Sequence, residues 1–166
     1  FPECIGFSLF GENPALWHGY AFALRLFGGW ALLWLLRGLW PQQRFATTMA
    51  ALLFVVYPGF TQHSIGLTYS SHFLTLLLAL LSIGLSLRAL SASNRRRFLA
   101  LTLLSMLLCA MYLLLLEFTI GLEALRLLLI GYVVVQQGRL PSSFSERVSV
   151  LLRLWLPYLL VTAAFL

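Results

Sequence analysis

The sequence contains no lysine and no aspartate, and its five acidic residues are all glutamates. Charged residues make up 10% of the chain and apolar residues 61%, whereas a soluble domain has about 25% charged residues. This balance excludes a soluble globular domain, a disordered segment and a coiled coil. Two cysteines, Cys4 and Cys109, are too few to staple a small domain. The composition predicts an all-α, polytopic transmembrane helical bundle in contact with lipid.

Several motifs of soluble enzymes are also missing from the sequence. It has no phosphate-cradling glycine loop, no serine nucleophile elbow and no dinucleotide fingerprint, so no cofactor is predicted. His63 and His72 lie nine residues apart without the HExxH spacing, so no metal site is predicted. The eleven arginines lie between apolar runs, and this predicts membrane topology rather than a nucleic-acid partner.

The apolar runs divide into six predicted helices, because a membrane-spanning helix needs roughly 20 apolar residues. The predicted ranges are 15–39, 41–57, 70–90, 98–116, 120–136 and 148–166. Pro58-Gly59 ends the second range, and the polar stretch Glu117–Gly121 is the only break between Phe98 and Val135. Pro157 predicts a kink in the last helix. We expect one transmembrane region that is an internal fragment of a longer protein, truncated at both ends.

The arginines predict how these helices are oriented. Every second connection is flanked by arginine, at Arg37 and Arg44, at Arg88 and Arg95–Arg97, and at Arg139 and Arg147. Residues 1–14, residues 58–69 and the turn at 117–121 contain none. By the positive-inside rule, the basic loops are expected in the cytoplasm, with the chain in a bacterial-type plasma membrane.

Polar side chains within the apolar runs are the candidate binding residues. His18 and Arg25, seven residues apart, share one face of the first helix. A charge at mid-bilayer costs at least about 2.5–3.5 kcal/mol, so Arg25 is expected to face the bundle or a wet cavity. It either pairs with a buried glutamate or backbone carbonyls, or it binds an anionic ligand. Glu123 and Arg126 are spaced for an intrahelical ion pair, while Glu117 alternatively shares an outward cavity with His18.

The segment from Tyr57 to His72 is rich in hydroxyl, amide and imidazole groups. Such groups suit sugar hydroxyls or phosphate oxygens, and they make His63 and Tyr69 candidate binding residues. The alternative is a plain interfacial loop, with His72 at the entry to the following helix.

Three stretches of the sequence resemble a known family. Phe10-Gly11-Glu12-Asn13-Pro14 precedes Trp17-His18, Phe54–Pro58 closes the second predicted helix, and Glu117 stands between two apolar helices. In this order the stretches resemble the N-terminal half of the polytopic C-type glycosyltransferases, in particular the protein-O-mannosyltransferase-like group. The resemblance covers most of the chain.

The resemblance implies an enzyme that takes a sugar from a polyprenyl-phosphate donor through an outward-facing pocket. A cation stabilises the departing phosphate, and a carboxylate deprotonates the acceptor hydroxyl. By resemblance, Arg25 or Arg126 would supply the cation, with His18, His63 and Tyr69 lining the pocket.

The sequence departs from the family pattern at three points. Tyr57 stands where histidine often precedes the proline, and Leu116 stands where lysine commonly precedes the glutamate. Family members use an acidic residue, usually aspartate, in the first outer loop, which lies mostly before Phe1. Neither Glu3 nor Glu12 matches that motif, so the catalytic residue is not assigned.

Two other classes of protein fit the same residues. In a transporter or channel segment, His18, Arg25, Glu117 and Glu123 would form a proton or anion pathway. The sequence shows no inverted repeat and no matched pair of broken helices, which argues against this class. In a non-catalytic integral membrane subunit, the polar groups would be structural. The sugar, the acceptor, the donor lipid and the oligomeric state stay open.

Overall fold

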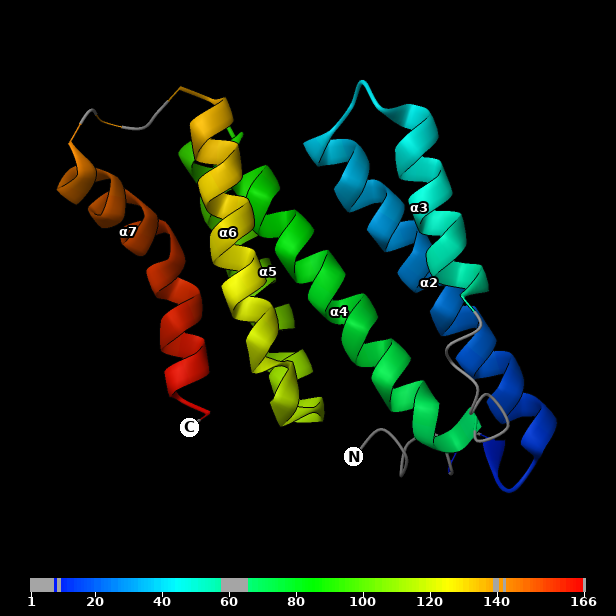
Figure 1. Cartoon of the computed structure of the whole chain (residues 1–166). Coiled ribbons are helices and arrows are strands. Elements are labelled where there is room, and N and C mark those ends of the chain that lie inside the picture. Colours follow the sequence, from blue (N-terminus) through cyan, green and yellow to red (C-terminus); the bar gives the residue numbers. More distant parts are fainter. Residues whose placement is uncertain (1–7, 9, 58–65, 139–140, 142, 166) are drawn as a thin grey trace. The chain divides into compact units, whose positions relative to one another are not determined.

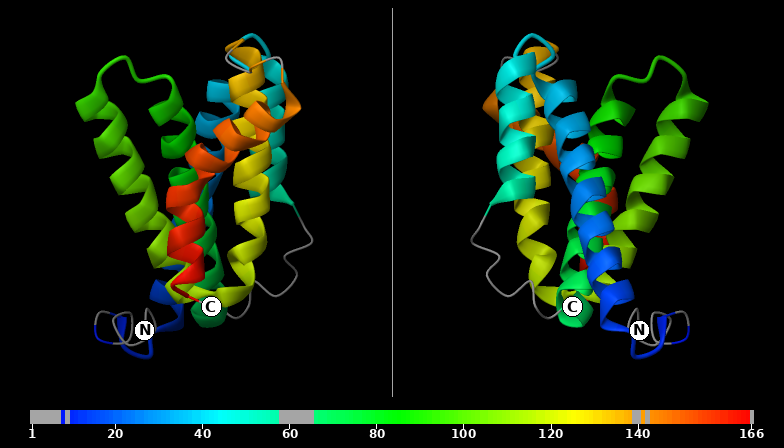
Figure 2. Two further views of the ribbon diagram at one scale, coloured as in Figure 1. Left: turned by 90° about the vertical axis from the view of Figure 1, so that its left-hand side faces the viewer. Right: turned by 90° about the vertical axis from the view of Figure 1, so that its right-hand side faces the viewer.

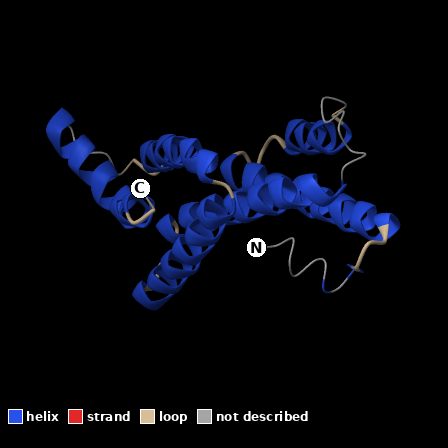
Figure 3. Cartoon of the chain, turned by 90° about the horizontal axis from the view of Figure 1, so that it is seen from below, coloured by secondary structure: helices blue, strands red, loops and turns tan. Residues whose placement is uncertain are grey.

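The computed structural model describes residues 8, 10–57, 66–138, 141 and 143–165. All regular structure in these residues is helical (Figure 1), and Figure 3 shows no strand among them. The helices are α2 (Pro14–Leu39), α3 (Arg44–Val56), α4 (Gly66–Leu90), α5 (Arg95–Leu115), α6 (Gly121–Gln136) and α7 (Phe144–Ala163), with a 3-10 turn η1 (Glu117–Ile120) before α6. The predicted all-α fold is therefore confirmed.

Four described segments are long and apolar enough to cross a membrane. They are Pro14–Leu39, Tyr69–Leu90, Arg95–Leu115 and Phe118–Gln136. Helix α3 has 13 residues, which is about 20 Å at about 1.5 Å per residue and shorter than a bilayer core of about 30 Å. Helix α7 carries Glu146, Arg147 and Arg153 and is not among the four. The structure thus shows an apolar helical protein with four candidate spans.

Local side-chain chemistry explains where two of the helices begin. The Asn13 Oδ1 accepts a hydrogen bond from the Ala15 N–H at 3.0 Å, ahead of α2. The Asn94 Oδ1 accepts from the Arg96 N–H at 2.9 Å, ahead of α5. Side-chain acceptors of this kind satisfy the donors that the first helical turn leaves without intrahelical partners.

Four predicted helix starts were displaced from the observed ones by three or four residues. That of α5 was placed at Phe98, whereas the helix begins at Arg95. That of α3 was placed at Pro41, but Pro41 lies in a turn and the helix starts at Arg44. This turn is closed by the Gln43 N–H, which donates to the Trp40 carbonyl at 3.1 Å. Helices α4 and α7 begin four residues earlier than predicted, at Gly66 and Phe144. Polar residues in their first turns had marked these positions as loop.

The chain forms two compact units, residues 1–80 and 81–166. In the first unit α2 and α3 run antiparallel and side by side (Figure 1). They meet at Gly28 and Gly29, where an added Cβ on Gly28 would lie 3.7 Å from Phe54 and one on Gly29 would overlap Val55. The glycines therefore allow close helix packing, as is common between membrane helices.

The start of α4 packs against α2 in the same unit. Ala21, Leu24 and Phe73 are buried together, and partly buried side chains surround them. These surrounding residues are Tyr20, Tyr69, Leu74 and Leu77. The end of α3 thus lies beside the middle of α2, and the first turns of α4 pack against α2 at Ala21 and Leu24.

The second unit contains the end of α4 together with α5, η1, α6 and α7. The 3-10 turn η1 makes the predicted reversal between α5 and α6. At the other end, the Gln137 Nε2 donates to the Ser91 Oγ at 3.2 Å, so the α4–α5 connection lies beside the end of α6. Figure 2 shows α7 changing direction between its orange and red parts. Pro157 lies inside this helix and has no N–H for the Arg153 carbonyl.

Candidate functional site

Arg25 lies near the middle of α2 in the first unit and is half-buried. Its Nη2 donates a hydrogen bond to the Tyr57 carbonyl oxygen at 3.0 Å. Tyr57 is the residue at which α3 ends, and a cation is favourable at a helix C-terminus. A backbone carbonyl, which is one of the partners offered for Arg25 by the structural alternative, is therefore observed. The guanidinium also lies where the hydroxyl-rich segment begins.

Tyr69 and His72 lie in the first turns of α4, and their rings stack with centres 5.5 Å apart. Tyr69 also packs against the buried cluster that joins α2 and α4. Of the predicted site residues, Arg25 and Tyr69 thus both belong to the first unit, and Tyr69 packs against the cluster that contains Leu24, the neighbour of Arg25. His18 is exposed on the first turns of α2.

An aromatic cluster stabilises the beginning of α2. The rings of Phe10 and Trp17 meet edge to face with centres 5.4 Å apart, and Phe10 lies equally close to Tyr20. The Trp17 Nε1 donates to the Gly11 carbonyl at 3.0 Å, and Gly11 takes a positive φ of 56°. Such a φ favours glycine. The Phe10–Pro14 stretch therefore forms a turn at Gly11, and the hydrogen bond from Trp17 stabilises this turn.

A second polar cluster is built around Glu123 and Arg126 of α6 in the second unit. The Arg126 Nε lies 3.1 Å from the Glu123 Oε1 and 3.0 Å from its Oε2. Arg126 is 0% exposed and Glu123 is 3% exposed. The intrahelical ion pair predicted from their spacing is confirmed, and it is fully buried.

The remaining donors of Arg126 reach two other helices. Its Nη1 donates to the Ser105 Oγ of α5 at 3.0 Å, and its Nη2 donates to the Ser82 Oγ of α4 at 2.7 Å. Each serine hydroxyl also lies 2.7 Å from the backbone carbonyl of the other serine. The guanidinium carbon lies 4.0 Å from the ring centre of Tyr158 in α7, which is a cation–π contact. One arginine therefore joins four helices.

Two side chains of α5 donate hydrogen bonds to the carboxylate of Glu123. The Tyr112 hydroxyl donates to Oε1, and the Cys109 thiol donates to the same oxygen at 3.4 Å. Both donors are 0% exposed. We call these seven residues the α6 network: Ser82, Ser105, Cys109, Tyr112, Glu123, Arg126 and Tyr158.

The α6 network is electrically neutral, because the charges of Arg126 and Glu123 compensate each other. The buried Glu123 Oε2 contacts the Arg126 Nε at 3.0 Å and accepts no hydrogen bond among the described residues. Burying either charge alone in an apolar bundle would be costly. Of the two alternatives for Glu123 and Arg126, the geometry favours the structural one. The network lets α6 carry two charges inside the helix bundle.

The partners of this ion pair were not predicted from the sequence. Ser82, Ser105, Tyr112 and Tyr158 are hydroxyl residues inside apolar runs. Hydroxyl side chains at interhelical positions of membrane helices often hydrogen bond across the interface, and this was the available signal. Which of them meet Arg126 depends on which helix faces pack together.

Two predicted site residues lie outside what the structure describes. His63 falls in residues 58–65, and the side chain of Glu117 is not described, although its backbone forms η1. Within the described residues, no group of three or more histidine, cysteine, aspartate or glutamate side chains could hold a metal ion. Cys109 is a free, buried cysteine.

Comparisons of the chain with protein families, with curated proteins and with solved structures found no match. Function is therefore inferred from the polar groups of the two units and from the sequence stretches that resemble a known family.

Proposed function

We propose that the chain is the helical membrane part of a glycosyltransferase that takes its sugar from a polyprenyl phosphate. The observation that carries the proposal is the contact between Arg25 and the Tyr57 carbonyl. It brings a guanidinium to Tyr57, the first residue of the hydroxyl- and imidazole-rich segment Tyr57–His72. A sugar-phosphate donor needs a cation for its phosphate and hydrogen-bonding groups for its sugar in one pocket.

The proposal assigns the phosphate to Arg25 rather than to Arg126. All three nitrogens of the Arg126 guanidinium are hydrogen bonded within the α6 network, and the side chain is 0% exposed. A phosphate could reach it only by breaking the ion pair with Glu123. Arg25 is half-buried, so a phosphate can approach it more readily than it can approach the 0% exposed Arg126.

In the proposed reaction the lipid tail of the donor stays in the bilayer, and the sugar phosphate binds beside Arg25 in the first unit. The acceptor oxygen attacks the anomeric carbon, and the bond to the phosphate oxygen breaks with its electron pair. Arg25 stabilises the negative charge that develops on the phosphate. A carboxylate accepts the proton of the acceptor hydroxyl. Tyr69 and His72 are the proposed sugar contacts from α4.

The proposal includes a topology. All six helices cross the membrane, with the arginine-flanked connections in the cytoplasm and the proposed donor site opening to the opposite side of a bacterial-type plasma membrane. The supporting observation is the distribution of the arginines, which alternates from one connection to the next.

The test supplies the full-length protein in proteoliposomes with a radiolabelled polyprenyl-phosphate sugar. We expect label to leave the lipid and to appear on an acceptor or as free sugar. No loss of label, together with ion or solute flux across the same membranes, would instead support a transporter.

The α6 network supports a second candidate, a membrane subunit without catalysis. Its charges are satisfied within the chain, as expected for residues that hold helices together. This candidate predicts neither transfer nor flux in the same proteoliposomes. It also predicts that the chain copurifies with a partner membrane protein in fixed ratio.

A further inference from the structure

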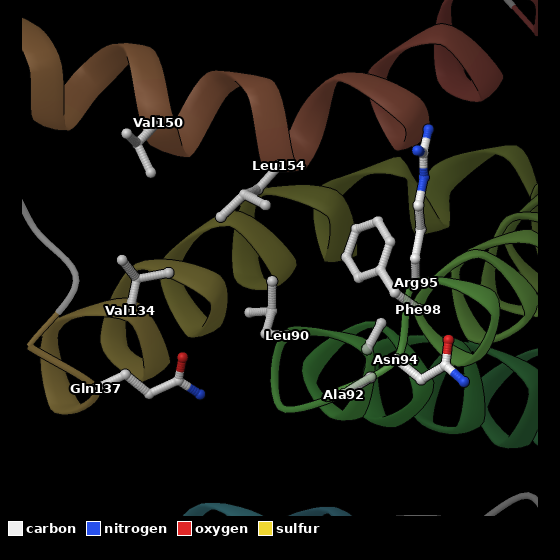
Figure 4. Close-up of a pocket in the computed structure, with 10 residues that line it drawn as sticks. Leu90, Ala92, Asn94, Arg95, Phe98, Val134, Gln137, Val150 and Leu154 are labelled. Atoms are coloured by element: carbon white, nitrogen blue, oxygen red, sulfur yellow. The ribbon is translucent and has the colours of Figure 1, made fainter.

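A cavity of about 510 Å³ lies in the second unit, at the end where α4 finishes and α5 begins (Figure 4). Most of its lining is apolar, and helices α4 to α7 all contribute to it. The lining residues are Ala89, Leu90, Ala92, Asn94, Arg95, Phe98, Val134, Gln137, Val150 and Leu154. Figure 4 shows Val150 and Leu154 on α7 and Val134 on α6, across the cavity from one another.

A second cavity of about 320 Å³ adjoins the first, because Ala89, Leu90, Phe98 and Leu154 line both. It continues along the bundle between exposed leucines of α5. Leu103, for example, is 63% exposed and lines this cavity. The two cavities form one apolar groove that reaches the outer surface of α5, and we call it the α5 groove.

The charges along the α5 groove have one sign. Arg95 lines the first cavity and Arg153 lines the second, and neither lining contains a carboxylate. Arg96 and Arg97 follow Arg95 in the first turn of α5, which has no acidic residue. Cations at a helix N-terminus interact unfavourably with the positive end of the helix dipole. A bound anion would reduce this repulsion. Glu146 is exposed at the start of α7 and lines neither cavity.

Gln137 adds a polar group at the same end. Its Nε2 donates to the Ser91 Oγ at 3.2 Å, while its Oε1 is buried without a hydrogen-bond partner among the described residues. A buried polar atom without a partner is costly, and a ligand that supplies one would be favoured. The Ser91 hydroxyl can accept from the Gln137 amide nitrogen or donate to the amide oxygen. Either end of the amide can therefore face a ligand while the other contacts Ser91.

We propose that the α5 groove binds an anionic phospholipid of the surrounding bilayer. The phosphate lies beside Arg95, the glycerol region lies near Gln137, and one acyl chain lies along Leu90, Phe98 and Leu154. Basic pockets between membrane helices hold anionic head groups in this way. The site uses only residues of the second unit and does not depend on the proposed transferase activity.

The test compares two lipids that differ in head-group charge. The purified full-length protein in neutral detergent is titrated with dioleoylphosphatidylglycerol or with dioleoylphosphatidylcholine. The apparent Kd is read from the rise in Tm, and bound lipids are counted by native mass spectrometry. We expect one phosphatidylglycerol to bind and raise Tm, with little effect of phosphatidylcholine. A Tm that rises equally with both lipids would overturn the proposal.

Two pairs of variants separate the groove from general attraction to a charged surface. Arg95→Gln should weaken phosphatidylglycerol binding about five-fold or more, whereas Arg96→Gln, with the same charge change outside the lining, should weaken it much less. Val150→Phe should fill the cavity and abolish lipid binding without lowering the stability of the protein. Val148→Phe, outside both linings, should leave lipid binding unchanged.

Three outcomes contradict the proposal. Equal weakening by Arg95→Gln and Arg96→Gln would show diffuse surface attraction. Retention of the bound lipid by Val150→Phe would place the lipid elsewhere. If polyprenyl phosphate displaces phosphatidylglycerol at a concentration below that of the phosphatidylglycerol, the groove prefers a polyprenyl lipid to the proposed phospholipid.

Discussion

Arg126 and Glu123 lie one turn apart on α6, with the guanidinium Nε 3.1 and 3.0 Å from the two carboxylate oxygens and both side chains buried. The pair is neutral as a whole. Two serine hydroxyls accept hydrogen bonds from the guanidinium, and the Tyr112 hydroxyl donates to the Glu123 Oε1. Removing one member leaves a buried charge, whereas removing both leaves an uncharged interface that still contains the Ser82, Ser105 and Tyr112 hydroxyls. The consequences for stability are therefore strongly non-additive.

Arg126→Leu should lower the free energy of unfolding by about 3–5 kcal/mol, because Glu123 would remain buried without its cation. The double variant Glu123→Leu with Arg126→Leu should be more stable than either single variant. Unfolding by sodium dodecyl sulfate in bicelles measures all three. Additive losses in the double variant would show that the two side chains act independently.

Ser105→Ala should lower the free energy of unfolding by about 1 kcal/mol, because the Arg126 Nη1 loses its acceptor on α5. Ser86→Ala is the matched control. Ser86 is also buried, but its hydroxyl donates within α4 to the Ile83 carbonyl at 2.7 Å. The same unfolding assay should show a smaller loss for this variant, and equal losses would argue against an interhelical role for Ser105.

Gly29→Ala should disrupt the pairing of α2 and α3, because its Cβ would overlap the Val55 side chain. Gly28→Ala should be tolerated, since its Cβ would make ordinary contact with Phe54 at 3.7 Å. Thermal unfolding in detergent compares the two, and we expect the lower Tm for Gly29→Ala. Adding Val55→Ala should restore part of the loss. Failure of that rescue would show that the overlap is not the cause.

The sequence predicted the helices well and the polar contacts only in part. Helix order and the turn before α6 follow from apolar runs and a few breaking residues, which act locally. The Glu123–Arg126 pair was predictable because both members lie on one helix at a fixed spacing. Ser82 and Tyr158 were not, because their contact with Arg126 depends on which faces of different helices meet.

The proposed topology predicts a difference in chemical labelling between two connections. In a background with Cys4 replaced by serine, Ser93→Cys lies between α4 and α5, and Phe118→Cys lies in η1. Phe118 is 70% exposed, and the remaining Cys109 is buried. An impermeant thiol reagent added outside cells should label Phe118→Cys and leave Ser93→Cys unlabelled. The reverse pattern would invert the orientation.

The α5 groove also predicts a property of the protein as isolated. Protein purified gently from membranes should carry phosphatidylglycerol in preference to phosphatidylcholine when both are present. Extraction with lipid counting by mass spectrometry measures this ratio. The Val150→Phe variant should lose the enrichment, while Val148→Phe keeps it.

The proposed role of Arg25 is most directly tested by the turnover of a radiolabelled polyprenyl-phosphate sugar in Arg25 variants. Arg25→Gln should lower kcat by about a hundred-fold, the usual effect of losing a group that stabilises transition-state charge. Arg25→Lys should retain part of the rate. Arg37→Gln is the control, because Arg37 also links α2 to α3, through Thr48 at 3.3 Å, but at the opposite end of the helices.

We predict that Arg25→Gln loses turnover while its Tm stays near that of Arg37→Gln, and that Arg37→Gln turns over like the unmodified protein. Wild-type turnover in Arg25→Gln would contradict the account, because Arg25 would then only cap the end of α3.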